Sequence, residues 1–248
     1  MQETVHARLT NRIDLWWIKP LLMLIGLIIG FGYLTWAAFQ NSHYFFEAYT
    51  SPVYASPYVP QWWKISPAFL LLWIPAGFRL TCYYGRKVYY RAIFADPANC
   101  TVEEPHRRSY SGESKWPLIL MNSHRYFLYL ALALTALHWY ELLTSLQHNG
   151  AWYLGLGSLI LLIDTIALSM YVFGCHSLRH IFGGQRGACF SDCGGCAKAK
   201  YKMWKGVSFL NAFHGFWFWV SLFSIAVADL YIRLLAMGII PFDPHIAF

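Results

Sequence analysis

Residues 152–182 read WYLGLGSLILLIDTIALSMYVFGCHSLRHIF, an apolar run whose last third carries a cysteine and two histidines. A helix that crosses a membrane needs about 20 mostly apolar residues, and this run supplies them with a single acidic residue, Asp164. Three more cysteines follow between Cys189 and Cys196, before the next apolar run begins. The stretch predicts a membrane helix whose end carries thiol and imidazole groups, which are favoured ligands of transition metals.

The composition of the chain is that of a membrane protein. Of its 248 residues, 57% are hydrophobic and 12% are charged, whereas a soluble domain carries about 25% charged residues. Aromatic residues make up 19%, as expected where Trp and Tyr form belts at two membrane interfaces. The net charge of +7 could indicate nucleic acid binding, but the basic residues are confined to the ends of apolar runs. That placement predicts membrane topology and no nucleic acid partner.

Five apolar stretches are long enough to cross a membrane. They cover about residues 15–39, 66–94, 117–146, 152–182 and 207–237. The chain has no internal repeat and no low-complexity tract, so residues 1–248 are expected to form a single transmembrane domain. The predicted fold class is an all-α membrane protein, a bundle of five transmembrane helices.

The distribution of Lys and Arg predicts how this bundle lies in the membrane. With a cytoplasmic N-terminus, all but two of the 19 Lys and Arg residues fall on the inner side, and the two exceptions are Lys64 and Arg233. Cytoplasmic loops of membrane proteins carry such an excess of positive charge. The sequence therefore predicts a cytoplasmic N-terminus and an outer C-terminus.

Several ionisable residues lie inside the predicted helices, where they are costly unless they face a partner or a polar cavity. Arg79 lies a turn or more deeper than Arg86, so we expect it to face a cavity, a partner charge or a ligand. Asp164 must face the bundle, either in a proton path or as a hydrogen-bond partner of a neighbouring helix. Two further pairs lie about one helical turn apart and are interpreted as structural: Asp229 with Arg233, and His138 with Glu141.

The end of the second stretch, residues 82–91, is basic and aromatic. Its apolar character fades while its helical propensity persists, which predicts a stalk that projects past the membrane and suits docking of a soluble partner. The alternative is a set of ordinary interface side chains that reach towards water.

Thiol and imidazole groups gather at the inner end of the predicted bundle. With the basic residues as markers of the inner surface, nine such groups fall in this part of the sequence: Cys82, His124, Cys175, His176, His180, Cys189, Cys193, Cys196 and His214. The outer half offers only His138 within a helix. Two haems stacked across the membrane would need a pair of axial histidines in each leaflet, so the sequence does not predict two haems.

Two kinds of redox centre remain open. One haem b could be ligated by two of His124, His176 and His214, which leaves the cysteines without a role. A [2Fe–2S] cluster of the Rieske type, with two His and two Cys ligands, would use both kinds of side chain and have a raised reduction potential. The usual Cys-x-His and Cys-x-x-His spacing is absent, so the ligands would have to come from different helices.

These residues also have plain structural interpretations. A lone cysteine in an apolar helix, such as Cys175, is interpreted as a small buried hydrophobe. The loop thiols Cys189, Cys193 and Cys196 could form a structural zinc site or stay reduced. They also leave open a membrane thiol–disulfide relay protein, which would catalyse thiol exchange on its own.

Four segments resemble the membrane anchor subunit of succinate dehydrogenases and fumarate reductases, respiratory complex II. They are Phe78-Arg-Leu-Thr-Cys-Tyr-Tyr84, Asn122-Ser-His-Arg-Tyr126, Gly174-Cys-His-Ser-Leu-Arg-His180 and Leu210-Asn-Ala-Phe-His214. The resemblance is to a branch with one large anchor polypeptide, in which a membrane-embedded Rieske-type [2Fe–2S] cluster stands in place of haem. It implies a multi-pass subunit of a prokaryotic plasma membrane that is not active alone.

The resemblance further implies partners and a reaction. A flavoprotein subunit and an iron–sulfur subunit would dock on the cytoplasmic face, and the whole complex could form a higher oligomer in the lipid membrane. Electrons from succinate would pass through this chain to a quinone, the substrate of the membrane half-reaction.

The preferred ligands follow from this resemblance. The preferred thiolates are Cys82, Cys100 and Cys189, the preferred imidazoles are His124, His176 and His214, and four of these six would hold one cluster. Arg79, Tyr83 and Arg125 are expected to contact the quinone, because they offer donors to a carbonyl oxygen whose charge grows on reduction.

Overall fold

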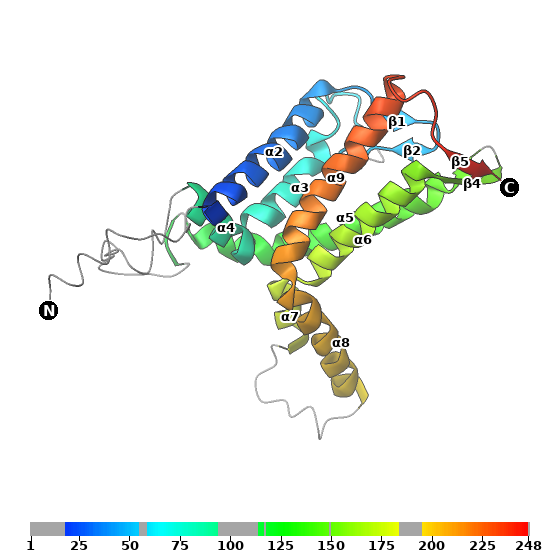
Figure 1. Ribbon diagram of the computed structural model, residues 1–248. Helices are drawn as coiled ribbons and strands as arrows, with labels where there is room; N and C mark the ends of the chain where they lie inside the picture. The colour runs from blue at the N-terminus through cyan, green and yellow to red at the C-terminus, as the bar shows by residue number, and fades with distance from the viewer. Residues whose placement is uncertain are drawn as a thin grey trace, which may run out of the picture.

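The computed structural model describes residues 18–54, 59–93, 114–116, 118–148, 150–183 and 195–247. Figure 1 shows a bundle of helices with short strands at one end and the helix pair α7 and α8 projecting beyond the other end. The elements in chain order are α2 (Ile18–Gln40), β1 (Phe45–Phe46), β2 (Tyr49–Thr50), α3 (Phe69–Leu80), α4 (Tyr83–Ile93), η2 (Leu118–Ser123), α5 (His124–Ser145), β3 (Gln147–His148), β4 (Ala151–Gly155), α6 (Leu156–Phe173), α7 (His176–Gly183), α8 (Gly195–Ala212), α9 (His214–Ala236) and β5 (His245–Ala247).

Within the described residues, four helical segments are long and apolar enough to cross a membrane: Ile18–Gln40, Leu118–Ser145, Leu156–Phe173 and His214–Ala236. They lie within four of the five predicted apolar stretches, apart from a few residues, and the helical membrane character of the chain agrees with the prediction.

The second predicted stretch, residues 66–94, is not one long helix. It is divided between α3, which has 12 residues, and α4, with a bend at Thr81 and Cys82. A helix of 12 residues is about 18 Å long, shorter than the hydrocarbon core of about 30 Å. The described residues thus give four candidate spans and a shorter apolar helix, where the sequence predicts five spans.

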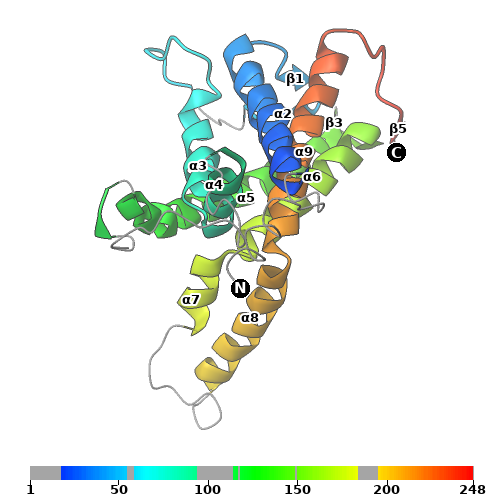
Figure 2. The same ribbon diagram turned by 60° about the vertical axis from the view of Figure 1, so that its left-hand side comes forward.

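Helix α4 packs against α2, and its Val88 side chain is 1% exposed. The prediction that residues 82–91 project as a stalk is therefore wrong, because the bend at Cys82 folds this segment back onto the bundle. The segments that do project are α7 and α8, which pack against each other (Figure 2).

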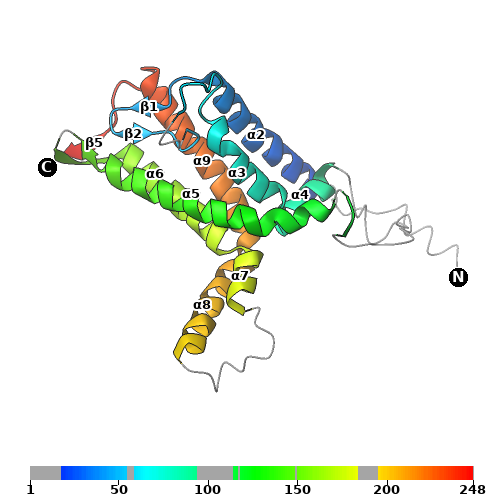
Figure 3. The same ribbon diagram turned by 180° about the vertical axis from the view of Figure 1, so that it is seen from behind.

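The centre of the bundle is the pair α6 and α9, with α5 packed against α6 and α3, and α2 packed against α9 (Figure 3). One core cluster lies near the bends of the chain and includes Phe78, Leu128, Tyr171 and Phe218. Burial of such large apolar and aromatic side chains fixes the relative positions of α3, α5, α6 and α9 in the interior of the bundle.

The other end, which carries β1 to β5 and is called the strand end below, is tied together by Asp243. Its carboxylate accepts hydrogen bonds from the hydroxyl of Tyr49 at 2.7 Å, the hydroxyl of Tyr231 at 2.5 Å and the backbone N–H of Gly157 at 3.1 Å. Burial, reinforced by Asp243, raises the pKa of the nearby Tyr153 hydroxyl in β4 to about 12. This end is therefore closed by a polar network between the strands and helices.

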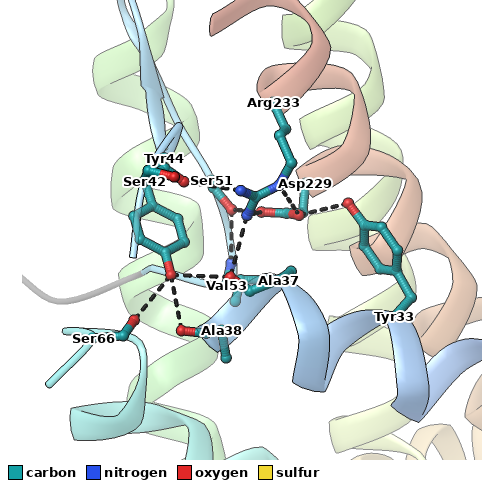
Figure 4. A network of polar contacts seen from close by, with 10 residues as sticks. All are labelled: Tyr33, Ala37, Ala38, Ser42, Tyr44, Ser51, Val53, Ser66, Asp229 and Arg233. Carbon is teal, nitrogen blue, oxygen red and sulfur yellow. Dashed lines mark hydrogen bonds and ion pairs between the residues drawn. The ribbon is translucent and has the colours of Figure 1, made fainter. Parts of the chain in front are cut away.

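A second network joins α9 to α2 and the β1–β2 hairpin (Figure 4). Arg233 Nε donates to Asp229 Oδ2 at 3.2 Å, which confirms the predicted pair. The hydroxyls of Tyr33 and Ser51 also donate to the Asp229 carboxylate, and Arg233 Nη1 donates to the carbonyl oxygen of Ser42 at 2.9 Å. Both charged side chains are almost fully buried, so the pair is satisfied by its surroundings, as a buried ion pair requires.

Candidate metal centre

Two cysteines and two histidines from four separate segments meet inside the bundle. Cys82 Sγ lies 3.3 Å from His214 Nε2, and Cys175 Sγ lies 3.1 Å from His124 Nε2. All four side chains are buried, and both cysteines are free thiols. These four residues are called the Cys/His cluster, and their end of the bundle the cluster end.

Each member of the cluster lies where the chain changes from one helical segment to the next. Cys82 lies directly before α4 and Cys175 directly before α7, while His124 is the first residue of α5 and His214 the first residue of α9. The first turn of a helix has backbone N–H groups without helical partners and the positive end of the helix dipole. The N-termini of α4 and α7, which directly follow Cys82 and Cys175, therefore favour negative charge at the two thiols.

Local contacts explain why α6 ends beside α9. Gly174 lies so close to its neighbours that a Cβ atom there would lie 2.8 Å from the Met170 carbonyl oxygen and 3.3 Å from His214 Nδ1. Asn211 Nδ2 donates to the carbonyl oxygen of Gly174 at 2.8 Å. The glycine and the amide thus hold the break between α6 and α7 against the break between α8 and α9.

Aromatic rings pack on the two imidazoles. Phe78 stacks on His124 with ring centroids 4.7 Å apart, and Tyr171 stacks on His214 with centroids 4.8 Å apart. The Nδ1 atom of His214 is buried and has no hydrogen-bond partner among the described residues. Leaving a buried nitrogen without a hydrogen bond costs about 1–3 kcal/mol. A bound group that contacts this nitrogen would recover that free energy.

The kinds of donor at this site match the ligands of a binuclear iron–sulfur cluster. No three His, Cys, Asp or Glu side chains in the described part of the chain lie close enough to hold one ion. A Rieske-type [2Fe–2S] cluster takes two histidines on one iron and two cysteines on the other, which matches the number and kind of residues here. Binding it would break the Cys82–His214 and Cys175–His124 hydrogen bonds.

Arg79 lies beside the cluster and is buried. Its guanidinium donates to the carbonyl oxygen of Phe218 at 3.1 Å and to Ser221 Oγ at 3.0 Å, and it lies over the Tyr171 ring at 4.6 Å. The sequence predicts polar partners for Arg79 because it lies deep in a helix. Two of these partners come from α9.

A cavity of about 120 Å³ begins at Arg79 and runs between α2, α3, α5, α6 and α9. Phe78 and Tyr171 line it near the cluster end, and Thr135 and His138 line it towards the strand end. Most of the wall is apolar, as in sites that take a flat apolar ligand with a few polar groups.

The structure brings together part of the predicted residue set. Cys82, His124 and His214 meet, and they are joined by Cys175, which the sequence interpretation treats as a small buried hydrophobe. The signal for Cys175 is its depth, because it lies at the same end of the bundle as the other three. His176 is exposed, with Nε2 3.0 Å from His180 Nε2, and Cys100 and Cys189 lie outside the described residues.

The three predicted quinone contacts lie in different places. Arg79 lines the cavity. Tyr83 is 57% exposed and lies under the Arg86 guanidinium at 5.1 Å, and Arg125 is also exposed. Neither of these two lines the cavity, and His138, which does, is assigned only a structural role by the sequence.

Comparison with known proteins agrees with this architecture. Residues 18–238 match the family described as actinobacterial succinate dehydrogenase subunit SdhC. A chain of the Mycobacterium smegmatis Sdh1 complex in the apo form is 36% identical, with a TM-score of 0.84, over 96% of this chain and 94% of that chain. No curated protein matches. With the family match covering most of its length, the chain belongs to the actinobacterial SdhC family and is a membrane subunit of a succinate dehydrogenase complex.

Proposed function

We propose that this subunit holds a Rieske-type [2Fe–2S] cluster and passes electrons from the docked iron–sulfur subunit to a quinone in the cavity beside Arg79. The observation that carries the proposal is the meeting of two thiols and two imidazoles at four helix breaks. The ligands would be Cys82, Cys175, His124 and His214. Such a cluster supplies one-electron transfer at a reduction potential raised by its histidine ligands.

The protein around the cluster would set its environment. The N-termini of α4 and α7 would stabilise thiolate charge, and the stacked rings of Phe78 and Tyr171 hold the imidazoles in place. Burial of all four ligands excludes bulk water, and solvent exclusion is one of the factors that tune the potential of such a centre.

Arg79 would act on the quinone. It lies between the Cys/His cluster and the cavity, and a guanidinium has five N–H donors in a fixed plane. Two contacts, to the Phe218 carbonyl and Ser221 Oγ, fix its position. Its charge would stabilise a carbonyl oxygen that becomes negative as the quinone is reduced.

The cluster end would face the cytoplasm, where the basic residues of the sequence gather. The flavoprotein and iron–sulfur subunits would dock there, and the projecting pair α7 and α8 extends the surface available to them (Figure 1).

Paired variants test the ligand set in the purified complex. Electron paramagnetic resonance after dithionite reduction is expected to show a [2Fe–2S] signal that His214→Ala and Cys175→Ser abolish. His176→Ala is the matched control, since His176 is exposed and 3.0 Å from His180, and it is expected to keep the signal. A haem Soret band without this signal would instead support a haem b anchor, and thiol exchange by the isolated chain would support a thiol relay.

A further inference from the structure

We propose that Glu141, His138 and Asp164 form a proton relay that supplies the quinone cavity from the strand end, opposite to the end where electrons enter. The inference rests on the proposed function, because it requires a quinone in the cavity. Reduction of a quinone to a quinol takes up two electrons and two protons. The electrons come from succinate oxidation, and the protons must cross the protein to reach the cavity.

The route from the cluster end is obstructed in the proposed holo state. Phe78, Tyr171 and Arg79 lie between the cavity and the Cys/His cluster. The imidazoles of His124 and His214 would be iron ligands and could not carry protons through their ligating nitrogens. Protons from that end would have to pass the aromatic side chains of Phe78 and Tyr171.

At the strand end, titratable side chains lie one after another between the protein surface and the cavity. The Glu141 side chain is 21% exposed, and its Oε2 lies 3.3 Å from Nδ1 of His138, whose side chain is 7% exposed. His138 in turn lines the cavity. The predicted His138–Glu141 pair is thus confirmed, and it connects the protein surface to the cavity wall in two residues.

Asp164 continues this line into the bundle. Its side chain is 1% exposed and accepts a hydrogen bond from Ser224 Oγ at 2.6 Å. Ser224 Oγ also donates to the carbonyl oxygen of Ser221 at 3.4 Å, and Ser221 Oγ accepts a hydrogen bond from Arg79. Polar groups therefore connect Asp164 to the guanidinium that would hold the quinone, and α6, which carries Asp164, packs against α5, which carries His138. We call this set of groups, from Glu141 to Arg79, the polar column.

The contrast with Asp229 argues against a purely structural role for Asp164. Asp229 has an arginine and two hydroxyl donors. In the described part of the chain the Asp164 carboxylate accepts one hydrogen bond and forms no ion pair within 4 Å, and burying an unpaired carboxylate is energetically costly. A group that only joins α6 to α9 could be an uncharged amide, whereas a group that accepts and releases protons must be titratable.

The charged groups around His138 are consistent with the relay. Helix α5 contributes Glu141 and α6 contributes Asp164, while Arg79 of α3 lies at the far end of the cavity. Helix α2 brings only uncharged side chains to the cavity wall. Two carboxyl groups and one imidazole thus lie between the surface and the Arg79 guanidinium, and each of the three can accept and release a proton.

Proteoliposomes with a trapped pH dye test the direction of proton uptake. Succinate added outside activates only complexes whose flavoprotein faces outwards, and their strand ends then face the lumen. With valinomycin and potassium present, reduction of a lipid-soluble quinone is expected to make the lumen alkaline. A lumenal pH that does not change while quinone is reduced would overturn the relay and leave the proposed function intact.

Variants separate the relay from structural damage. His138→Phe and Asp164→Asn are expected to slow quinone reduction at least about tenfold and to abolish the lumenal signal. They should leave the [2Fe–2S] resonance and the rate with a soluble dye acceptor unchanged. Tyr140→Phe, an exposed neighbour on α5, is the control and should behave as the parent complex. Full quinone reduction and lumenal alkalinisation in both relay variants would contradict the inference.

Discussion

At the level of single residues, the ion pair of Arg233 and Asp229 holds part of the bundle near the strand end together. Its carboxylate is shared with Tyr33 and Ser51, and its guanidinium reaches the carbonyl oxygens of Ser42 and Ala37. One pair thus connects α9 to two segments that lie far from it in the sequence, the end of α2 and the β1–β2 hairpin.

Arg233→Met is therefore expected to lower the thermal midpoint of the complex, because it leaves Asp229 buried and unpaired. Breaking a buried pair in this way costs about 3–5 kcal/mol. The double variant with Asp229→Asn removes both charges and should recover much of the loss. Tryptophan fluorescence during heating in detergent measures this, and a double variant as unstable as the single one would contradict the account.

The Tyr153 hydroxyl at the strand end is expected to make the thermal stability of the complex depend on pH. Burial and Asp243 raise the pKa of its hydroxyl to about 12, whereas that of an unfolded tyrosine is about 10. The folded state thus favours the protonated phenol, and this contribution is present below pH 10 and lost as the pH rises towards 12. Tyr153→Phe is expected to show a shallower fall of the thermal midpoint between pH 10 and pH 12, and parallel curves would count against this.

At the level of elements, breaks between helices bring the four residues of the Cys/His cluster together. In a continuous helix from residue 152 to residue 182, Cys175 would lie within the helix and not at a break between two helices. The break at Gly174 instead lets Cys175 meet His124 of α5, and the break at Phe213 places His214 at the start of α9 beside Cys82.

Gly174→Leu is expected to lower iron and acid-labile sulfide in the purified complex and to weaken the [2Fe–2S] resonance in proportion. The added side chain would push against the Met170 and Leu210 carbonyl oxygens and His214 Nδ1. Gly32→Leu on the exposed side of α2 is the matched control, since a Cβ there meets nothing within 4 Å. Equal iron content in the two variants would show that the break does not depend on close approach at Gly174.

For the whole molecule, hydropathy and charge predict much of the arrangement. The long apolar runs become α2, α5, α6 and α9, since length and apolarity alone require such helices in a membrane. The depth of Cys82, His124 and His214 along these runs also predicts that they lie at one end, and the structure brings them together.

The sequence does not reveal the bend at Cys82 or the fourth member of the Cys/His cluster, Cys175. Helical propensity continues through residues 66–94 although the apolar character fades after Cys82, so nothing in the sequence marks the turn at Cys82 that folds α4 onto α2. Cys175 has the pattern of a buried small residue, and its contact with His124 depends on the packing of α5 against α6 and α7. The polar column from Glu141 to Arg79 likewise needs four helices, α3, α5, α6 and α9, in place before it exists.

Pulsed electron paramagnetic resonance on the reduced complex, grown with ¹⁵N-labelled histidine, tests the central claim most directly. The account predicts a [2Fe–2S] centre with strong hyperfine couplings to two histidine nitrogens, both of which disappear in His124→Ala/His214→Ala. A complex whose iron–sulfur signals all lack strong histidine coupling would contradict the claim that this membrane subunit carries the centre.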